Sequence, residues 1–246
     1  MLGTGFFILF FSVWAFFTLG GYVSPTFLAS PVTMVQEAIL LFTEFNFSQD
    51  IAMTIWRVLA GFILATLVGV PLGIAMGAHK GVEAFLEPFV SFCRYLPASA
   101  FIPLLILWAG IGELQKVLLI FIGSVFQIVL MVAVCVGVGA ARRDLVEAAY
   151  TLGASPSGTV NRVLIPGAAP EIAEILRLVL GWAWTYVIVA ELIGSSSGIG
   201  HMITNSQALL NTSQIIFGII VIGLIGLVSD FAFKALNRRL FAWSSL

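Results

Sequence analysis

Polar and charged side chains recur along one face of an otherwise apolar segment near residues 172–194. On a helical wheel of about 100° per residue, an arc of about 100° gathers Glu174, Arg177, Gly181, Trp184, Ile188 and Glu191. Carboxylates, a guanidinium and an indole on one stripe could pair with each other, hold a loop or meet a solute. An unpaired charge at the centre of a membrane helix costs about 2.5 to 3.5 kcal/mol. We therefore expect this stripe to face the inside of a helix bundle and not lipid.

Two polar residues outside the stripe fit a path for a small anion. Gln127 lies near the middle of another apolar segment, and Arg94 precedes a segment with two prolines. An aromatic wall, an amide and a positive entry charge would suit such a solute. We expect this path to be lined by Arg94, Gln127, Gly181 and Trp184. Because a carboxylate repels an anion, we assign Glu191 to an outer gate.

A structural interpretation of the same charges stays open. Glu174 and Arg177 lie near one end of their segment, where they could pair with each other or extend toward the membrane interface. Glu191 could instead hold the loop SSSGIG, which follows it closely in the sequence.

Residues typical of catalysis or metal binding are scattered. His79 and His201 lie alone in expected loops, and Cys93 and Cys135 lie in apolar segments without a base nearby in the sequence. We therefore expect no catalytic site and no metal site. The sequence also lacks the Gly-x-x-x-x-Gly-Lys-Ser/Thr phosphate loop. If ATP and Mg²⁺ drive this protein, another chain must bind them.

The composition indicates the environment that these residues occupy. Sixty per cent of the 246 residues are hydrophobic and 9% are charged, whereas a soluble domain has about 25% charged residues. Most of the chain must therefore face lipid. Without a charged tail or an internal repeat, residues 1–246 are expected to form one all-α transmembrane domain.

Six stretches are long enough to cross a membrane, which takes about 20 mostly apolar helical residues. They cover approximately 4–23, 52–78, 89–110, 114–140, 172–194 and 213–235. The first exceeds the apolar core of a signal peptide and follows no basic residue, so we interpret it as a span. Pro97 and Pro103 interrupt the hydrogen-bond ladder of the third, which should be broken or kinked. In the second, small residues recur every four positions at Gly69, Gly73 and Gly77, a spacing that lets helices approach closely, although glycine is also common in membrane helices generally.

Basic residues indicate the orientation, because cytoplasmic loops retain Lys and Arg. One set of alternate connections holds Lys80, Arg142, Arg143, Arg162, Lys234, Arg238 and Arg239, whereas the opposite set holds only Lys116. Both termini and the connection 141–167 should therefore face the cytoplasm. The segments 22–50, 110–113 and 195–212 should face outward.

The stretch EAAYTLGASPSGTVNRVLIP (147–166) is polar for so apolar a chain. Asp144 and Glu147 have the spacing of a capping box at a helix start, and Gly153 suits the left-handed residue that ends a helix. Ser155 and Pro156 are typical of the start of a second helix, which we expect to stop near Pro166. The pattern predicts two short helices joined by a sharp bend. A plain solvated loop is the alternative.

This stretch resembles the EAA signature of bacterial ATP-binding-cassette (ABC) importer permeases, which reads E-A-A, three residues, G, nine residues, I-x-L-P. Val163 and Ile165 depart from it with side chains of similar shape. Three further segments are similar to the branch with nitrate, bicarbonate, taurine and alkanesulfonate permeases: TIWRVLAGF (54–62), RYLPASAFIPLLILWAGIGE (94–113) and VAELIGSSSGIGHMI (189–203).

The resemblance implies a six-transmembrane-helix type I ABC importer permease fold (MetI-like) with a cytoplasmic coupling helix that sits in a groove of a separate ATPase. The coupling residues that it implies are Asp144, Glu147, Ala148, Ala149, Gly153 and Pro166. It also implies a multi-pass protein of the bacterial inner membrane that has no enzymatic activity and carries a small, anionic solute. The implied partners are a second copy of this chain, two ATPases that bind ATP and Mg²⁺, an extracytoplasmic solute-binding protein and membrane lipid, with no nucleic acid.

Three alternatives rank below this one. The solute could be another small organic molecule, such as a vitamin precursor. A secondary transporter would need ion-coupling residues and inverted repeats, and neither is visible in the sequence. An intramembrane enzyme would need converging catalytic groups.

Overall fold

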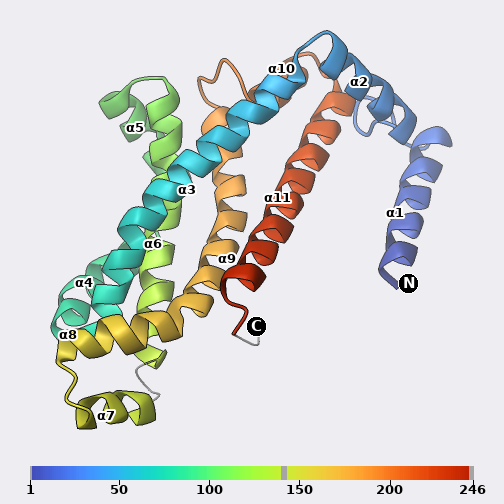
Figure 1. Cartoon of the computed structure of the whole chain (residues 1–246). Helices are drawn as coiled ribbons and strands as arrows, with labels where there is room; N and C mark the ends of the chain where they lie inside the picture. The colour runs from blue at the N-terminus through green and yellow to red at the C-terminus, as the bar shows by residue number, and fades with distance from the viewer. Residues whose placement is uncertain (1, 140–142, 244–246) are drawn as a thin grey trace. The chain divides into compact units, whose positions relative to one another are not determined.

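The computed structural model describes residues 2–139 and 143–243, and every regular element within these ranges is a helix (Figure 1). The helices are α1 (Leu2–Leu19), α2 (Pro31–Thr43), α3 (Phe47–Ala78), α4 (Lys80–Cys93), η1 (Ala98–Phe101), α5 (Ile102–Ala109), α6 (Glu113–Gly139), α7 (Arg143–Thr151), α8 (Pro156–Thr159), η2 (Val160–Leu164), α9 (Ile165–Glu191), α10 (Ile199–Ala208) and α11 (Thr212–Leu240). The prediction of an all-α protein is confirmed.

One compact unit contains residues 1–56 and 191–225. Its core joins α2, the start of α3, α10 and the first half of α11 through the side chains of Leu41, Phe47, Ile199, Met202 and Val221. The indole of Trp14 on α1 donates to the carbonyl oxygen of Ala29 at 2.9 Å. The segments that the charge pattern assigns to the outer side, 22–50 and 195–212, thus belong to the same unit.

The other compact unit contains residues 57–190 and 226–246. Within it, small residues on α3 lie against the backbone of α6. A Cβ atom at Gly69 would lie 2.8 Å from Ile128, and one at Gly73 would lie 2.7 Å from the carbonyl oxygen of Val129. Gly61 and Gly77 show the same closeness to α6. The spacing of these glycines therefore serves close helix packing, which is the role that their four-residue period predicts.

The contacts between α3 and α6 also give their relative direction. Gly61 meets Ile120, Gly69 meets Ile128, and Gly77 meets Val136, so the residue numbers rise together along both helices. Because α3 and α6 are parallel, the chain between them must return once across the membrane. The helices α4 and α5, with η1, provide that return as a single broken span.

The bend in this span confirms the expected interruption. The axis turns by 85° between Lys80–Cys93 and Ala98–Ala109. Pro97 precedes η1 with an extended backbone, ψ 122°, as the N-cap residue. Pro103 lies in the first turn of α5, where a missing N–H costs nothing, so it starts that helix and does not interrupt it.

Four helical stretches in the described residues are long and apolar enough to span a membrane, and the bent pair makes a fifth. The four are Phe47–Ala78, Glu113–Gly137, Pro156–Glu191 and Thr212–Leu240. The predicted second, fourth, fifth and sixth spans fall within them or within a few residues of their ends. The predicted first span corresponds to α1, which is shorter and apolar, so the count of six stays a prediction.

Candidate functional site

The connection between the fourth and fifth predicted spans contains a sharp bend at Gly153. Helix α7 ends there with φ +82° at Gly153, a conformation that strains any residue with a Cβ. The N–H of Gly153 donates to the carbonyl of Tyr150, and the N–H of Ala154 donates to the carbonyl of Ala149, both at 3.0 Å. This pair of bonds is a Schellman C-cap. The predicted left-handed role of Gly153 is confirmed.

The next helix begins as predicted but does not stop at Pro166. The Ser155 hydroxyl accepts from the N–H of Gly158 at 3.2 Å, and Pro156 occupies the first turn. The helix then continues without interruption to Glu191, so the expected end near Pro166 is wrong. Residues Val160–Leu164 form a π-helical turn, whose wider ring removes the i−4 hydrogen bond that a proline would break. Pro166 is therefore accommodated within one continuous helix.

Helix α7 exposes apolar side chains. Leu145 is 46% exposed and Tyr150 is 49% exposed, and Leu152, directly after the helix, is 87% exposed. Glu147 and Ala148 are exposed and Ala149 is half-buried, so small side chains leave the backbone of this helix accessible. The side chain of Asp144 and the whole of Arg142 lie outside the described residues, so the predicted capping box remains a prediction.

Arg94 and Gln127 line one small cavity, together with Tyr186. Arg94 follows the last residue of α4; its guanidinium donates to the Tyr95 hydroxyl at 2.8 Å and stacks 4.7 Å above that ring. Tyr186 on α9 fills the notch at Gly123 of α6, where a Cβ would lie 2.7 Å from its ring. The cavity measures about 20 Å³, which is room for about one water molecule. Its lining residues carry a guanidinium, an amide and a phenol, which are hydrogen-bond donors.

The stripe on α9 packs mainly against α11. Arg177 donates from Nε to Glu174 at 2.8 Å and also binds Asp230. Trp184 is buried, and its indole N–H donates to the Ser229 hydroxyl at 3.0 Å. These charges face a neighbouring helix, as expected, and the pairing of Glu174 with Arg177 is confirmed.

Gly181, by contrast, is exposed, with no atom near the position of a Cβ. Trp184 does not line the cavity of Arg94 and Gln127. The position of Trp184 therefore supports a packing role against α11 more than a wall of that cavity.

Glu191 holds the loop that precedes α10. Its carboxylate is buried, accepts from the Thr54 hydroxyl at 2.8 Å, and accepts from the N–H of Gly200 at 2.8 Å. The Thr54 hydroxyl in turn accepts from the N–H of Ile199 at 3.0 Å. These bonds satisfy free N–H groups in the first turn of α10. The loop-holding alternative for Glu191 is thus confirmed, and its role as a gate stays a prediction.

Several residues of these sites were missed by sequence reasoning. Asp50 accepts from the N–H of Gly198 at 2.6 Å, Asp230 binds Arg177, and Tyr186 completes the cavity of Arg94. Asp50 and Thr54 are four positions apart, so their shared helix face was a usable signal. Tyr186 carries no such sequence signal, because a tyrosine in an apolar helix is usually part of the packing.

The chain matches one known protein family and is similar to several known proteins. The family described as "Binding-protein-dependent transport system inner membrane component" matches residues 69–242. The taurine transport system permease protein TauC of Escherichia coli is 35% identical over 226 residues, which cover 90% of this chain and 82% of that protein. The putative aliphatic sulfonates transport permease protein SsuC of Bacillus subtilis is 35% identical, covering 91% and 80%. The bicarbonate transport system permease protein CmpB of Synechococcus elongatus is 32% identical, covering 75% and 66%.

Solved structures share the fold. A chain from the inward-facing MetNI methionine ABC transporter superposes with a TM-score of 0.69 at 18% identity, covering 78% of this chain and 95% of that one. A chain from an amino acid ABC transporter with histidines gives a TM-score of 0.60 at 18% identity, covering 87% and 98%.

Proposed function

Because the chain belongs to the binding-protein-dependent transport system inner membrane component family and is an ABC importer permease subunit, we propose that it moves a small anion, of the taurine, alkanesulfonate, bicarbonate or nitrate class, into the cell. The observation that supports the anionic class is that Arg94, Gln127 and Tyr186 come together around one cavity, whose volume of about 20 Å³ is too small to hold the solute unless the helices move apart. Its polar groups come from three separate helical segments, which is the arrangement expected where a solute passes between helices.

Coupling to a separate ATPase is the second part of the proposal. Helix α7 exposes Leu145 and Tyr150 next to small residues, and the exposed Leu152 directly follows the helix. Such a patch on a short, capped helix fits a groove on a partner protein. The helix that follows the Gly153 bend is continuous from Pro156 to Glu191, so a force applied to α7 would pass through the bend into the fifth span. This continuity supports α7 as the coupling helix, with Glu147, Ala148, Ala149 and Gly153 at its contact surface.

The assembly follows from the number of coupling helices. One chain supplies one such helix, and the two-ATPase engine of this family needs two, so we propose a homodimer with two ATPase subunits that bind ATP and Mg²⁺. We place both termini and α7 in the cytoplasm of a bacterial cell, from the distribution of Lys and Arg. The outer segments 22–50 and 195–212 belong to one compact unit, which supports their joint use as the docking surface of a solute-binding protein.

Reconstituted transport tests this proposal. The chain, purified with its ATPase and placed in liposomes, should take up labelled taurine, an alkanesulfonate, bicarbonate or nitrate only when ATP and the binding protein are present. Uptake driven by an ion gradient without ATP would show a secondary transporter instead. A native mass of one permease with a single ATPase would contradict the homodimer.

A substitution at Gln127 tests the solute path separately. Gln127→Leu should raise the KM of uptake by about tenfold or more, because a hydrogen bond to a charged solute contributes about 1.5 to 3 kcal/mol. Thr185→Val removes an exposed hydroxyl on α9 that donates only within its own helix, to the carbonyl oxygen of Trp182, and serves as the control. Equal KM values for Gln127→Leu and the unmodified chain would remove Gln127 from the path.

A further inference from the structure

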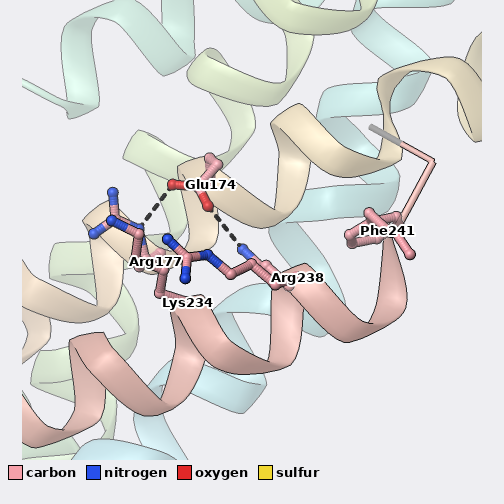
Figure 2. A pocket seen from close by; sticks show the side chains of 7 residues that line it. Glu174, Arg177, Lys234, Arg238 and Phe241 are labelled. Carbon is pink, nitrogen blue, oxygen red and sulfur yellow. Dashed lines mark hydrogen bonds and ion pairs between the residues drawn. The ribbon is translucent and has the colours of Figure 1, made fainter. Parts of the chain in front are cut away.

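A cavity of about 390 Å³ lies between α9 and the end of α11. Figure 2 shows the side chains that line it, among them Glu174, Arg177, Lys234, Asn237, Arg238 and Phe241. Three of these side chains are basic and one is acidic. The cavity lies apart from the one shared by Arg94 and Gln127, and neither the solute path nor the coupling surface uses it.

The acidic side chain in this cavity is already engaged. Glu174 accepts from Arg177 at 2.8 Å and from the Asn237 amide at 3.1 Å, the two bonds drawn in Figure 2. Lys234 and Arg238, in contrast, are exposed and make no side-chain hydrogen bond or close ion pair with the part of the chain that the structure describes, although the charge of Lys234 also attracts the Glu174 carboxylate. Two cations are thus available to an external anion.

The surface that leads to these cations is apolar. Leu227 is 51% exposed and Phe231 is 61% exposed. At about 100° per residue, both fall on the same face of α11 as Lys234 and Arg238. Along this face the chain therefore passes from exposed apolar side chains, suited to acyl chains, to two cations at the end of the span.

Aromatic residues mark the level of the membrane interface at this point. Phe241 lines the cavity, and its ring meets that of Trp243 edge-on with centroids 5.4 Å apart. Among aromatic side chains, Trp and Tyr concentrate at the headgroup level of a bilayer, and here Trp243 is such a residue. The cavity should therefore lie where phospholipid headgroups are found.

We propose that Lys234 and Arg238, at the mouth of the cavity between α9 and α11, bind the headgroup of an anionic phospholipid of the cytoplasmic leaflet. The phosphate accepts from the lysine ammonium and the arginine guanidinium, and the acyl chains lie along Phe231 and Leu227. Basic pockets between membrane helices on the cytoplasmic side are suited to such lipids. This assignment rests on the orientation proposed above, in which α11 ends in the cytoplasm.

A free phosphate is disfavoured as the occupant by the apolar approach. A small anion would use the two cations but would gain nothing from the exposed Leu227 and Phe231. A lipid uses both parts of the face. Phe231 should therefore contribute to the affinity for a phospholipid but not to the affinity for a free phosphate.

The test measures lipid retained by the permease complex. The permease, purified in detergent with its ATPase, is exposed to phosphatidylglycerol or to phosphatidylcholine, and bound lipid is counted by native mass spectrometry. The double variant Lys234→Gln/Arg238→Gln should lose at least half of the bound phosphatidylglycerol and leave phosphatidylcholine unchanged. Phe231→Ser should also lower phosphatidylglycerol binding. The matched control is Arg239→Gln, an adjacent exposed arginine that lies off this face.

Each outcome decides the proposal. Equal losses in Arg239→Gln and in the double variant would show general charge attraction and overturn the site. Competition by inorganic phosphate as strong as that by the lipid, with no effect of Phe231→Ser, would show a site for a free anion. Binding of phosphatidylglycerol to the permease complex in detergent does not depend on which way the chain crosses a membrane. Loss of the expected difference between the variants would therefore overturn the lipid site alone. The orientation is tested separately, by thiol labelling of Trp243→Cys in intact cells.

Discussion

Arg57 on α3 and Glu113 at the start of α6 form a two-point salt bridge. The Nε atom of Arg57 lies 2.6 Å from Oε2, and its Nη2 atom lies 2.6 Å from Oε1. Arg57 is fully buried, while the Glu113 side chain is 41% exposed. Paired bonds of this kind fix direction as well as distance. The bridge therefore holds α3 to the N-terminal end of the parallel helix α6.

Removing the carboxylate of this bridge should destabilise the protein. Glu113→Ala takes two hydrogen bonds from a buried guanidinium, and we expect the free energy of unfolding to fall by about 1 to 3 kcal/mol. Thermal unfolding of the detergent-solubilised chain measures the change. Glu83→Ala is the control, because its partner Lys80 is 93% exposed and surface pairs contribute at most about 1 kcal/mol. Equal losses in the two variants would show that burial of Arg57 does not matter.

Close packing of α3 on α6 makes Gly73 sensitive to any added side chain. In Gly73→Ala the new Cβ would lie 2.7 Å from both the Val129 carbonyl oxygen and the Val132 Cβ, so the helices must separate. We expect a loss of about 1 to 3 kcal/mol in the free energy of unfolding, the usual cost of overpacking. Gly223→Ala on α11 has open space at its Cβ and should change stability little. An unchanged midpoint of thermal unfolding in Gly73→Ala would contradict the close contact.

The bend at Gly153 should be necessary for ATP-driven uptake. Gly153→Val places a β-branched residue at φ +82°, which costs about 1 kcal/mol or more and redirects α8. The variant should insert into the membrane normally but lose uptake in proteoliposomes. Gly223→Val on α11 is the control, since its Cβ meets open space, its backbone is helical and it lies outside the connection 141–167. Normal uptake by Gly153→Val would mean that the bend plays no part in coupling.

The loop before α10 should open when Glu191 is changed. Glu191→Ala removes acceptors of the Gly200 N–H and the Thr54 hydroxyl. Hydrogen exchange of the amides in residues 195–201 should become faster by about tenfold or more, since each lost bond to a charged group contributes about 1.5 to 3 kcal/mol. Glu191→Gln keeps one acceptor oxygen and should show a smaller effect. If both variants exchange like the unmodified chain, the carboxylate does not hold this loop.

The sequence predicted local features better than contacts. Gly153, Ser155 and Pro97 each have a conformational reason to stand where they do, and their roles follow from three or four neighbouring residues. Pro166 was misjudged because the π-helical turn that accommodates it depends on how α8 joins α9 and leaves no composition signal.

Contacts between distant segments explain the remaining differences. The stripe on α9 correctly predicted that Arg177, Trp184 and Glu191 contact neighbouring segments, but not that Gly181 is exposed, and it could not distinguish a solute path from a neighbouring helix. Arg177 donates to Asp230, which lies 53 positions further along the chain. Trp184 donates to Ser229, which lies 45 positions further. Both acceptors are on α11. Hydrophobic periodicity predicts which face of a helix is buried but does not predict which segment packs on that face.

The parallel packing of α3 and α6 has a consequence for biosynthesis. The notches at Gly61, Gly69 and Gly73 are filled by residues of α6, which the ribosome completes only after the whole broken span of α4 and α5. Until α6 has been synthesised, the residues that fill these notches in the complete structure are missing. This helix pair therefore cannot dock before the broken span between them has been synthesised. Nascent chains that end before residue 117 should expose α3 to quality-control proteases, and chains that extend past residue 137 should escape them.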